Sequence, residues 1–261
     1  MNEKLFILKT PLQNMNAKRL LIFFLIILLL SILSIFYPAL TGQVTKSIEY
    51  EKEPATLIRV IDGDTIEVDD GAHIRLLGIN TPEKKMPFSG EAANFLKQFE
   101  NKTIFLLRDK EDIDKYKRKL RYVFFEDRLL NREILEKGFA SAYMLEDLKY
   151  ADDFKIAEKT ARLNEVGIWK KSPDICASCI VLNELNATEE FFIIKNNCQF
   201  DCTLDGWFVK DSGRNTFYLS LISAGEEEKV LSKNNKSVWN DAGDSFFMFD
   251  KSGLLVEYYE Y

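Results

Sequence analysis

Residues 62–83 read DGDTIEVDDGAHIRLLGINTPE, and this stretch decides the fold of the region around it. The β-branched runs 57–61 and 65–68 predict two strands joined by a tight turn at Asp62-Gly63-Asp64, where Gly63 is free to take a positive φ. A second turn signal at 69–71 leads into a third predicted strand, 73–77. Such a meander brings Asp64 and the turn that contains Asn80 to the same end of a small sheet.

Oxygen-bearing side chains and one arginine gather at that end of the predicted sheet. A hard divalent cation such as Ca²⁺ prefers oxygen ligands. Five residues can supply them: Asp62, Asp64, Asn80, Thr81 and Glu83. The planar, permanently charged guanidinium of Arg75 matches a phosphate. A cation beside an arginine is what phosphodiester chemistry needs; the alternative is a pair of acidic turns that bind nothing.

The segment 115–119, KYKRK, carries the densest positive charge in the chain. Lys115 and Lys117 offer charge for phosphates, and Tyr116 between them offers a ring for stacking a base. The segment therefore predicts contact with a nucleic-acid strand, and the alternative is a solvated loop face. With a formal net charge of −6, the chain is not expected to bind nucleic acid through its overall charge, so any such contact must come from a local patch.

Three segments together, 54–65, 75–83 and 114–120, resemble the staphylococcal nuclease (thermonuclease) family, and the resemblance covers roughly 54–169. It implies an OB-fold β-barrel with covering helices, and Ca²⁺-dependent cleavage of DNA and RNA. The five predicted strands, with 103–107 and 120–125 as the last two, fit such a barrel. Helical spacing at 90–99, 128–137 and 148–164 predicts the helices, the second closed by Gly138 as a C-cap.

The resemblance also implies roles for individual residues. Asp64, Asn80 and the Thr81 carbonyl correspond to the family's Ca²⁺ ligands, with Asp62 nearby. Glu83 corresponds to the glutamate that activates water, and Arg75 and Arg118 to the two arginines that clamp the phosphate. Tyr116 corresponds to a tyrosine near the phosphate. Tyr143 matches a tyrosine of the nucleotide pocket more loosely, and a core position is the alternative.

Two residues depart from the family pattern. Asn80 stands where the family usually has an aspartate ligand, which removes one negative charge and should weaken Ca²⁺ binding. Lys117 stands where the family usually has glycine, and a positive φ there would cost about 1 kcal/mol. Either change fits an active enzyme or a decayed site, so a catalytically inactive nucleic-acid- or protein-binding surface module is the second hypothesis.

Residues 20–36 are uninterrupted Leu, Ile, Phe and Ser, and 37–40 can extend them to nearly the thickness of a bilayer core, about 30 Å. Lys18 and Arg19 precede this run, which places residues 1–19 in the cytoplasm and the rest outside. We predict a transmembrane signal anchor at 20–40 followed by a linker, 41–53, and a nuclease-like domain, 54–170. The alternative is a cleaved signal peptide and a secreted protein.

After a predicted linker, 171–178, the segment 179–261 alternates short strands with Gly-containing turns, which predicts a β-sandwich. The motifs LDGW at 204–207 and WNDAGD at 239–244 resemble the lamin-tail domain, an Ig-like sandwich. The resemblance implies that this domain binds a partner or acts as a spacer, and the sequence does not identify the partner. Trp207 is expected to be a core residue. A surface adhesion or scaffolding protein is the third hypothesis. We expect a monomer.

Four cysteines lie near this boundary: Cys176, Cys179, Cys198 and Cys202. Their two close pairs predict two disulfides or a four-thiolate zinc site, and free thiols are the third alternative. Disulfides are favoured if this part of the chain lies outside the membrane. The sequence does not determine which cysteines pair.

Overall fold

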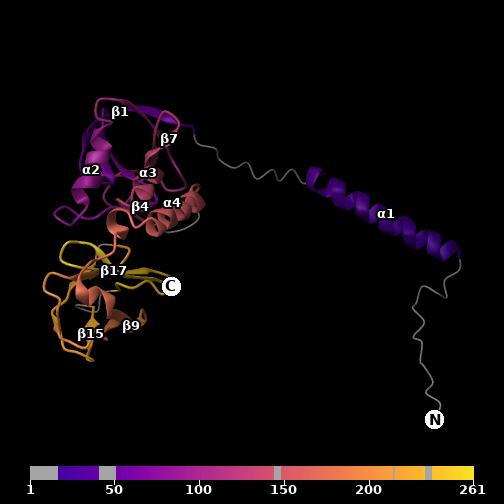
Figure 1. Ribbon diagram of the computed structural model, residues 1–261. Helices are drawn as coiled ribbons and strands as arrows, with labels where there is room; N and C mark the ends of the chain where they lie inside the picture. The colour runs from indigo at the N-terminus through magenta and orange to yellow at the C-terminus, as the bar shows by residue number, and fades with distance from the viewer. Residues whose placement is uncertain (1–16, 41–50, 144–147, 214, 233–236) are drawn as a thin grey trace, which may run out of the picture. The chain divides into compact units, whose positions relative to one another are not determined.

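The computed structural model describes residues 17–40, 51–143, 148–213, 215–232 and 237–261 (Figure 1). The chain divides into two compact units, Met1–Glu49 and Tyr50–Tyr261. The first unit contains α1 (Ala17–Leu40). Within the described part of the chain, no helix is both long and apolar enough to cross a membrane. This finding does not support the membrane span predicted at 20–40, and the side chains of residues 34–40 lie outside the described part of the chain.

Five strands of the second unit close into a barrel. They are β1 (Glu53–Val60), β2 (Thr65–Val68), β3 (His73–Leu76), β5 (Thr103–Leu107) and β6 (Lys119–Phe125). Antiparallel neighbours run in the order β3-β2-β1-β5-β6, and a parallel pairing of β3 with β6 closes the ring. This order confirms the predicted OB-fold barrel. Two short additions, β7 (Arg128–Leu129) on β6 and the pair β4 (Ile79–Asn80) with β8 (Ser141–Ala142), extend it.

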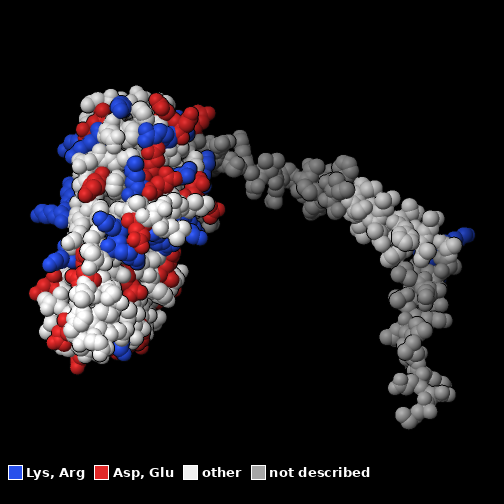
Figure 2. All heavy atoms as spheres, viewed as in Figure 1, with Lys and Arg blue, Asp and Glu red and all other residues white. Residues whose placement is uncertain are grey.

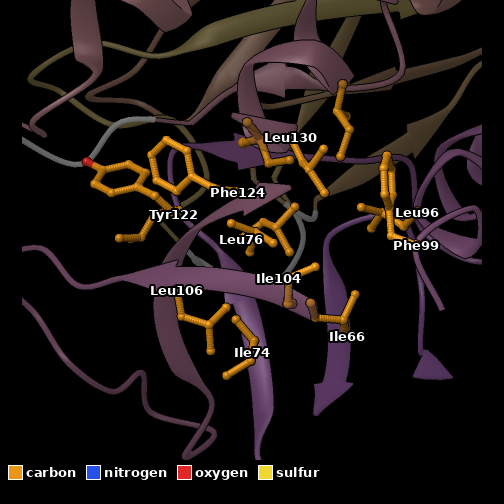
Figure 3. Close-up of a cluster of buried hydrophobic side chains, with 14 of the residues drawn as sticks. Ile66, Ile74, Leu76, Leu96, Phe99, Ile104, Leu106, Tyr122, Phe124 and Leu130 are labelled. Carbon is orange, nitrogen blue, oxygen red and sulfur yellow. The ribbon is translucent and has the colours of Figure 1, made fainter. Parts of the chain in front are cut away.

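Alternating apolar residues of the strands fill the barrel (Figure 3). Ile66, Ile74, Leu76 and Ile104 are fully buried there. Helices α2 (Ser89–Lys97), α3 (Leu130–Glu136) and α4 (Ala151–Leu163) add apolar faces to the same cluster. The predicted helices thus exist, with shifted ends. Gly138 follows α3 with φ 66°, the left-handed conformation expected of a residue that ends a helix.

The C-terminal region (residues 175–261) begins with a short 3₁₀ helix, η3 (Ile175–Ser178), and is otherwise built of strands. One antiparallel sheet joins β15 (Glu227–Leu231), β10 (Phe191–Asn196) and β9 (Ile180–Asn186). Another joins β13 (Thr216–Tyr218), β12 (Phe208–Lys210), β16 (Ser245–Phe249) and β17 (Leu255–Glu260). A separate small pair consists of β11 (Cys202–Thr203) and β14 (Leu221–Ile222).

One hydrophobic cluster receives side chains from both larger sheets. Phe192 comes from β10 and Phe246 from β16, and their rings contact each other at 5.3 Å. Trp207 lies in this cluster with 1% of its surface exposed, as expected of a core residue. A turn at Asp205-Gly206, where Trp207 N–H donates to the Leu204 carbonyl, separates β11 from β12. The Ig-like architecture and the lamin-tail resemblance stay predictions.

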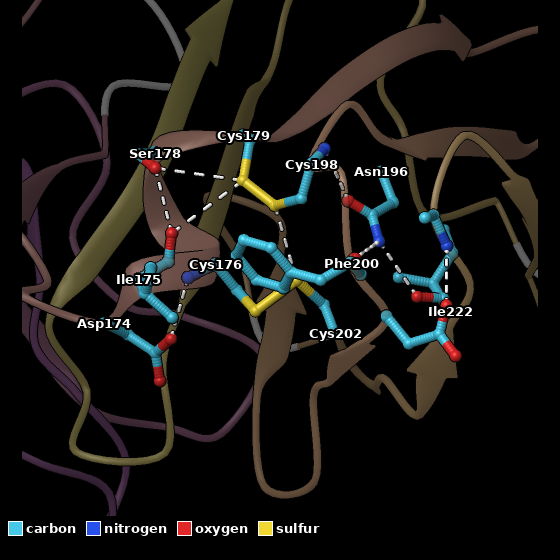
Figure 4. Close-up of a disulfide and its surroundings, with 12 residues drawn as sticks. Asp174, Ile175, Cys176, Ser178, Cys179, Asn196, Cys198, Phe200, Cys202 and Ile222 are labelled. Atoms are coloured by element: carbon cyan, nitrogen blue, oxygen red, sulfur yellow. Dashed lines mark hydrogen bonds between the residues drawn. A yellow bond between two sulfur atoms is a disulfide. The ribbon is translucent and has the colours of Figure 1, made fainter.

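All four cysteines form disulfides, Cys176–Cys202 and Cys179–Cys198 (Figure 4). The zinc alternative is therefore wrong for this structure, since a disulfide sulfur is no longer a thiolate ligand. The bonds join η3 and the start of β9 to the segment 198–202. They fix the entry of the chain into the C-terminal region, where small cores gain most from crosslinks.

The nuclease-like barrel and the C-terminal region share an apolar interface within the second unit. Ala161, Ile168 and Trp169 lie in one buried cluster with Phe208, Phe247, Phe249 and Leu255. The predicted linker at 171–178 takes part in it, because Ser172 N–H donates to the Leu255 carbonyl and Leu255 N–H to the Lys170 carbonyl, each at 2.8 Å. The η2 turn (Gly167–Trp169) completes this contact.

Candidate active site

Asp64, just before β2, lies at the centre of the predicted site and is 7% exposed. Its Oδ2 accepts hydrogen bonds from Thr81 N–H at 3.2 Å and from Thr81 Oγ1 at 3.1 Å. Gly63 makes this approach possible, because a Cβ at that position would overlap Thr81 and Ala92. The positive φ expected of Gly63 is wrong, because Gly63 is not among the glycines in the left-handed conformation. Its lack of a side chain leaves room for Thr81 instead.

Arg75 projects from β3, directly opposite Thr65 of β2, and its guanidinium is held on three sides. Its Nε lies 3.2 Å from Asp64 Oδ1. One terminal nitrogen donates to the Leu76 carbonyl at 2.7 Å, and the other to Asn80 Oδ1 at 3.3 Å. The side chain is therefore preorganised and 10% exposed. Sequence analysis placed Arg75 in the site but not these partners.

Arg118 comes from the turn before β6, yet it reaches the same network. Its Nη1 donates to Thr65 Oγ1 at 3.1 Å, and Thr65 Oγ1 donates to Asp64 Oδ1 at 3.0 Å. Asp64 and Thr65 thus connect the two arginines by direct contacts. Sequence analysis gave Thr65 no role, although it follows Asp64 in the quoted motif.

Asp114 orients Arg118, and sequence analysis also missed this role. Its Oδ2 accepts from Arg118 Nε at 2.8 Å and lies 2.7 Å from Nη2. Burial alone would raise the pKa of Asp114, but hydrogen bonds from the Arg118 backbone and side chain outweigh it, so the pKa lies below its ordinary value. The spacing of an acid four residues before an arginine is the signal that could have identified the pair.

The predicted basic segment forms a tight exposed turn. Lys117 N–H donates to the Asp114 carbonyl, and Lys117 has φ 65°, the left-handed conformation that a family glycine would adopt without strain. Tyr116 is 56% exposed, and its ring lies 5.5 Å from the Arg118 guanidinium. Lys115 is exposed beside it. On the face shown in Figure 2, basic and acidic side chains are interspersed, which agrees with a local rather than a general basic surface.

Asn80 has an unexpected set of partners. Its Oδ1 accepts from Arg75, while its Nδ2 donates to the carbonyls of Ser212 at 2.9 Å and Gly213 at 3.0 Å. Both carbonyls belong to the C-terminal region. An aspartate could not donate either bond. The departure from the family pattern therefore has a structural reason that the sequence did not reveal.

Glu83 and Tyr143 lie at the edges of the network. Glu83 follows Pro82 and is exposed, and it lines a cavity of about 170 Å³ together with Asn80 and Lys210. Tyr143 is half-buried, and its N–H donates to the Gly78 carbonyl beside β4. The structure thus brings Asp62, Asp64, Arg75, Asn80, Thr81 and Arg118 together. Glu83 and Tyr143 flank them, and the turn 115–117 leads away from Arg118.

The oxygen donors suit a hard cation by type, but they are few. Asp62 accepts from Asp64 N–H at 3.2 Å, and burial together with the charge of Asp64 raises the pKa of Asp62. A nearby cation would relieve this repulsion. Among the described residues, however, oxygens of Asp62, Asp64 and Glu83 do not all lie within 4.8 Å of one another. The residues present fit Ca²⁺ chiefly through Asp62 and Asp64.

Comparison with known proteins agrees with the barrel. Residues 73–171 match the family model described as staphylococcal nuclease homologue. The chain is 36% identical over 124 residues to the thermonuclease of Staphylococcus hyicus, a match that covers 43% of this chain and 73% of that protein. With the thermonuclease of Staphylococcus intermedius it shares 38% over 125 residues, 43% of this chain and 74% of that protein. The chain belongs to the staphylococcal nuclease family.

This family membership confirms the resemblance stated for the barrel and makes the protein a nuclease. Endonuclease YncB of Bacillus subtilis is a further relative, 36% identical over 130 residues, which are 45% of this chain and 62% of that protein. The family model ends at residue 171. The C-terminal region, whose Ser212 and Gly213 carbonyls accept hydrogen bonds from Asn80, lies beyond the residues that match this family model.

Proposed function

We propose that this member of the staphylococcal nuclease family is a Ca²⁺-dependent nuclease that hydrolyses phosphodiester bonds of DNA and RNA. The observation that carries the proposal is the direct connection Arg75–Asp64–Thr65–Arg118. It fixes two guanidinium groups at one end of the barrel, beside the exposed carboxylate of Glu83. A module that only binds nucleic acid needs the arginines, but it does not need the glutamate.

The residues divide the reaction between them. Arg75 and Arg118 hold the phosphate oxygens and stabilise the negative charge that grows in the pentacoordinate transition state. Glu83 positions the attacking water and accepts its proton. Asp62, Asp64, the Thr81 carbonyl and the Asn80 amide oxygen would hold Ca²⁺, which when bound supplies Lewis acidity toward the phosphate.

Substrate contact extends from this centre along the basic turn. Lys115 and Lys117 add phosphate-facing charge, and the exposed ring of Tyr116 offers a stacking surface. Tyr143, on the other side of the network, lines the nucleotide pocket. Because the net charge is −6, affinity for nucleic acid depends on this local patch and decreases steeply with salt.

We further propose that the nuclease works outside the cytoplasm, at the cell surface or secreted. The two disulfides support this location, since such bonds persist in oxidising compartments. An external enzyme would also meet the high calcium concentrations that a site with an amide in place of one carboxylate needs.

A cleavage assay on the full chain tests the proposal. DNA and RNA are incubated with the protein over a wide range of Ca²⁺ concentrations, beside Glu83→Gln and the control Glu91→Gln, an exposed glutamate of α2. We expect cleavage that rises with calcium, is lost in Glu83→Gln and is retained in Glu91→Gln. Cleavage by Glu83→Gln at the wild-type rate would remove the assigned role.

One observation favours the second candidate, a catalytically inactive binding module. The amide of Asn80 is engaged on both sides, by Arg75 and by the Ser212 and Gly213 carbonyls, so a cation would have to share its oxygen with Arg75. Folded wild-type protein that binds nucleic acid but leaves it intact at every calcium concentration would establish this alternative.

A further inference from the structure

A lysine of the C-terminal region reaches the nuclease site. Lys210 ends β12, and its side chain lines the cavity of about 170 Å³ that Asn80 and Glu83 also line. Phe208, Phe247 and Phe249 also line this cavity, and the centre of the Phe247 ring lies 5.8 Å from the Lys210 ammonium. A lysine in such surroundings needs negatively charged neighbours.

The charged neighbours come from both parts of the second unit. Burial lowers the pKa of Lys210, while the charges of Asp211, Glu83 and Asp64 act in the opposite direction and favour its ammonium form. Asp64 and Glu83 are the carboxylates to which the proposed function assigns cation binding and water activation. In its ammonium form, Lys210 places a positive charge in the cavity that Glu83 lines, near the carboxylates that a divalent cation would use.

The segment that carries Lys210 is fixed rather than loosely placed. Asp211 accepts from Asn215 N–H at 3.0 Å, and Asp244 accepts from Ser212 N–H at 3.1 Å. The Ser212 and Gly213 carbonyls then accept the two bonds from Asn80. Asn80 thus connects the barrel to the segment that follows Lys210.

The interface around this segment is closely packed. Phe208 and Phe249 lie in the buried cluster shared with Ile168 and Trp169. Gly253 approaches Pro87 so closely that a Cβ on the glycine would overlap the proline ring. The position of Lys210 therefore follows from a built contact between the two regions.

We propose that Lys210 is a specificity-determining residue of the nuclease site, an internal cation that competes with a divalent ion for Asp64 and Glu83. Asn80 holds the segment that carries Lys210 against the barrel, through its bonds to the Ser212 and Gly213 carbonyls. Two like charges near the same carboxylates repel each other, so the lysine weakens calcium binding beyond the loss of one carboxylate at Asn80. Catalysis is thereby restricted to surroundings rich in calcium. The inference rests on the proposed function only for the location of the cation site.

Calorimetric titration of the full chain with Ca²⁺ tests the inference. Lys210→Met removes the charge and keeps an unbranched side chain suited to the phenylalanine-lined wall. Lys195→Met is the matched control, because it removes the same charge from the same region, where Lys195 pairs with Glu227. We expect calcium to bind Lys210→Met at least about tenfold more tightly than wild type, a change of about 1.4 kcal/mol, and Lys195→Met like wild type. Equal affinities in all three proteins would overturn the inference.

Two further measurements keep the outcomes distinct. Lys210→Gln serves if Lys210→Met does not fold, since an amide also removes the charge but stays polar beside Glu83. Cleavage is assayed on the same proteins. Wild-type cleavage with unchanged calcium affinity in the Lys210 variants overturns the inference and leaves the nuclease. Tighter calcium binding in these variants without cleavage by any protein supports the inference and removes the catalytic function.

Discussion

The candidate site has two halves that are built differently. The phosphate half, consisting of Arg75, Arg118 and the residues between them, is assembled within the barrel. The proposed cation half takes Asp62 and Asp64 from the barrel, but its other residues, Asn80 and Glu83, lie beside the C-terminal region: Asn80 donates to the Ser212 and Gly213 carbonyls, and Glu83 shares a cavity with Lys210. The comparison teaches that the two arginines are held by the barrel alone, whereas the surroundings of the proposed cation site also depend on a second region.

The phosphate half is most sharply tested by Arg118→Ala. We expect cleavage to fall by a factor of about 100 or more, equivalent to about 3 kcal/mol of transition-state stabilisation. The melting temperature should change little, because the side chain of Arg118 contacts Asp114, Thr65 and the exposed ring of Tyr116 rather than the hydrophobic core. Arg132→Ala, which removes an arginine paired with Glu136 on α3, is the control for charge. Activity of Arg118→Ala close to wild type would show that one guanidinium suffices.

The C-terminal region is tested by the double substitution Cys176→Ser and Cys202→Ser. The disulfide closes a loop with a sequence separation of 26, so its loss should lower the free energy of unfolding by about 3 kcal/mol. Denaturant titration measures this change. The matching pair Cys179→Ser and Cys198→Ser, with a separation of 19, should cost a similar amount. An unchanged midpoint in either protein would mean that the crosslink does not limit the unfolded chain.

Asn80→Asp tests the cation half directly. The substitution removes both bonds to the Ser212 and Gly213 carbonyls and places a carboxylate against them, so we expect a loss of about 1–3 kcal/mol in stability without calcium. Calcium should stabilise this variant more than wild type, because it regains the family's charged ligand. Thermal unfolding with calcium and with chelator measures both effects. Asn94→Asp, on the exposed face of α2, is the control. Stability equal to wild type in chelator would show that the docking bonds contribute nothing.

Glu158 supports the β4–β8 pair that carries Asn80, and it gives a pH-dependent test. Its Oε1 accepts from Ala142 N–H at 2.7 Å, and burial raises its pKa to about 7 from an ordinary value of 4.5. Below pH 4.5 the group is protonated in both states and costs nothing. As the pH rises from 4.5 to 7, the unfolded state releases this proton while the folded state still holds it, so stability falls, and the full penalty remains above pH 7.

Replacing Glu158 by Gln should therefore stabilise the protein by about 1–3 kcal/mol above pH 7 and have little effect below pH 4.5. Denaturant titrations at several pH values measure the difference, with Glu91→Gln as a control that leaves the profile unchanged. If the difference in stability between Glu158→Gln and wild type were the same at every pH, burial would not raise the pKa of Glu158.

The sequence predicted the phosphate half more fully than the cation half. Strand patterning placed Asp64 and Arg75 at one end of a small sheet, because Thr65 and Arg75 are in register on neighbouring strands. Arg118 came from the family resemblance, since its contact with Thr65 joins residues 53 apart in the chain. The partners of Asn80 lie about 130 residues away, so no local pattern could indicate them. Lys210 was overlooked for the same reason: its role arises from tertiary packing. The four cysteines predicted disulfides, but their pairing required the fold.

Lys117 and Asn80 are both departures from the family pattern, and the last prediction contrasts them. Lys117 has φ 65°, which costs a non-glycine residue about 1 kcal/mol, whereas glycine loses roughly 0.5 kcal/mol in chain entropy. Lys117→Gly should therefore increase stability by about 0.5 kcal/mol, and Lys117→Asn, which tolerates this conformation, by a similar amount. Both should weaken binding to single-stranded DNA and reduce its salt dependence by about one phosphate contact. If stability rises while binding is unchanged, the lysine does not serve the substrate, and only Asn80 among the two departures has a function in the site.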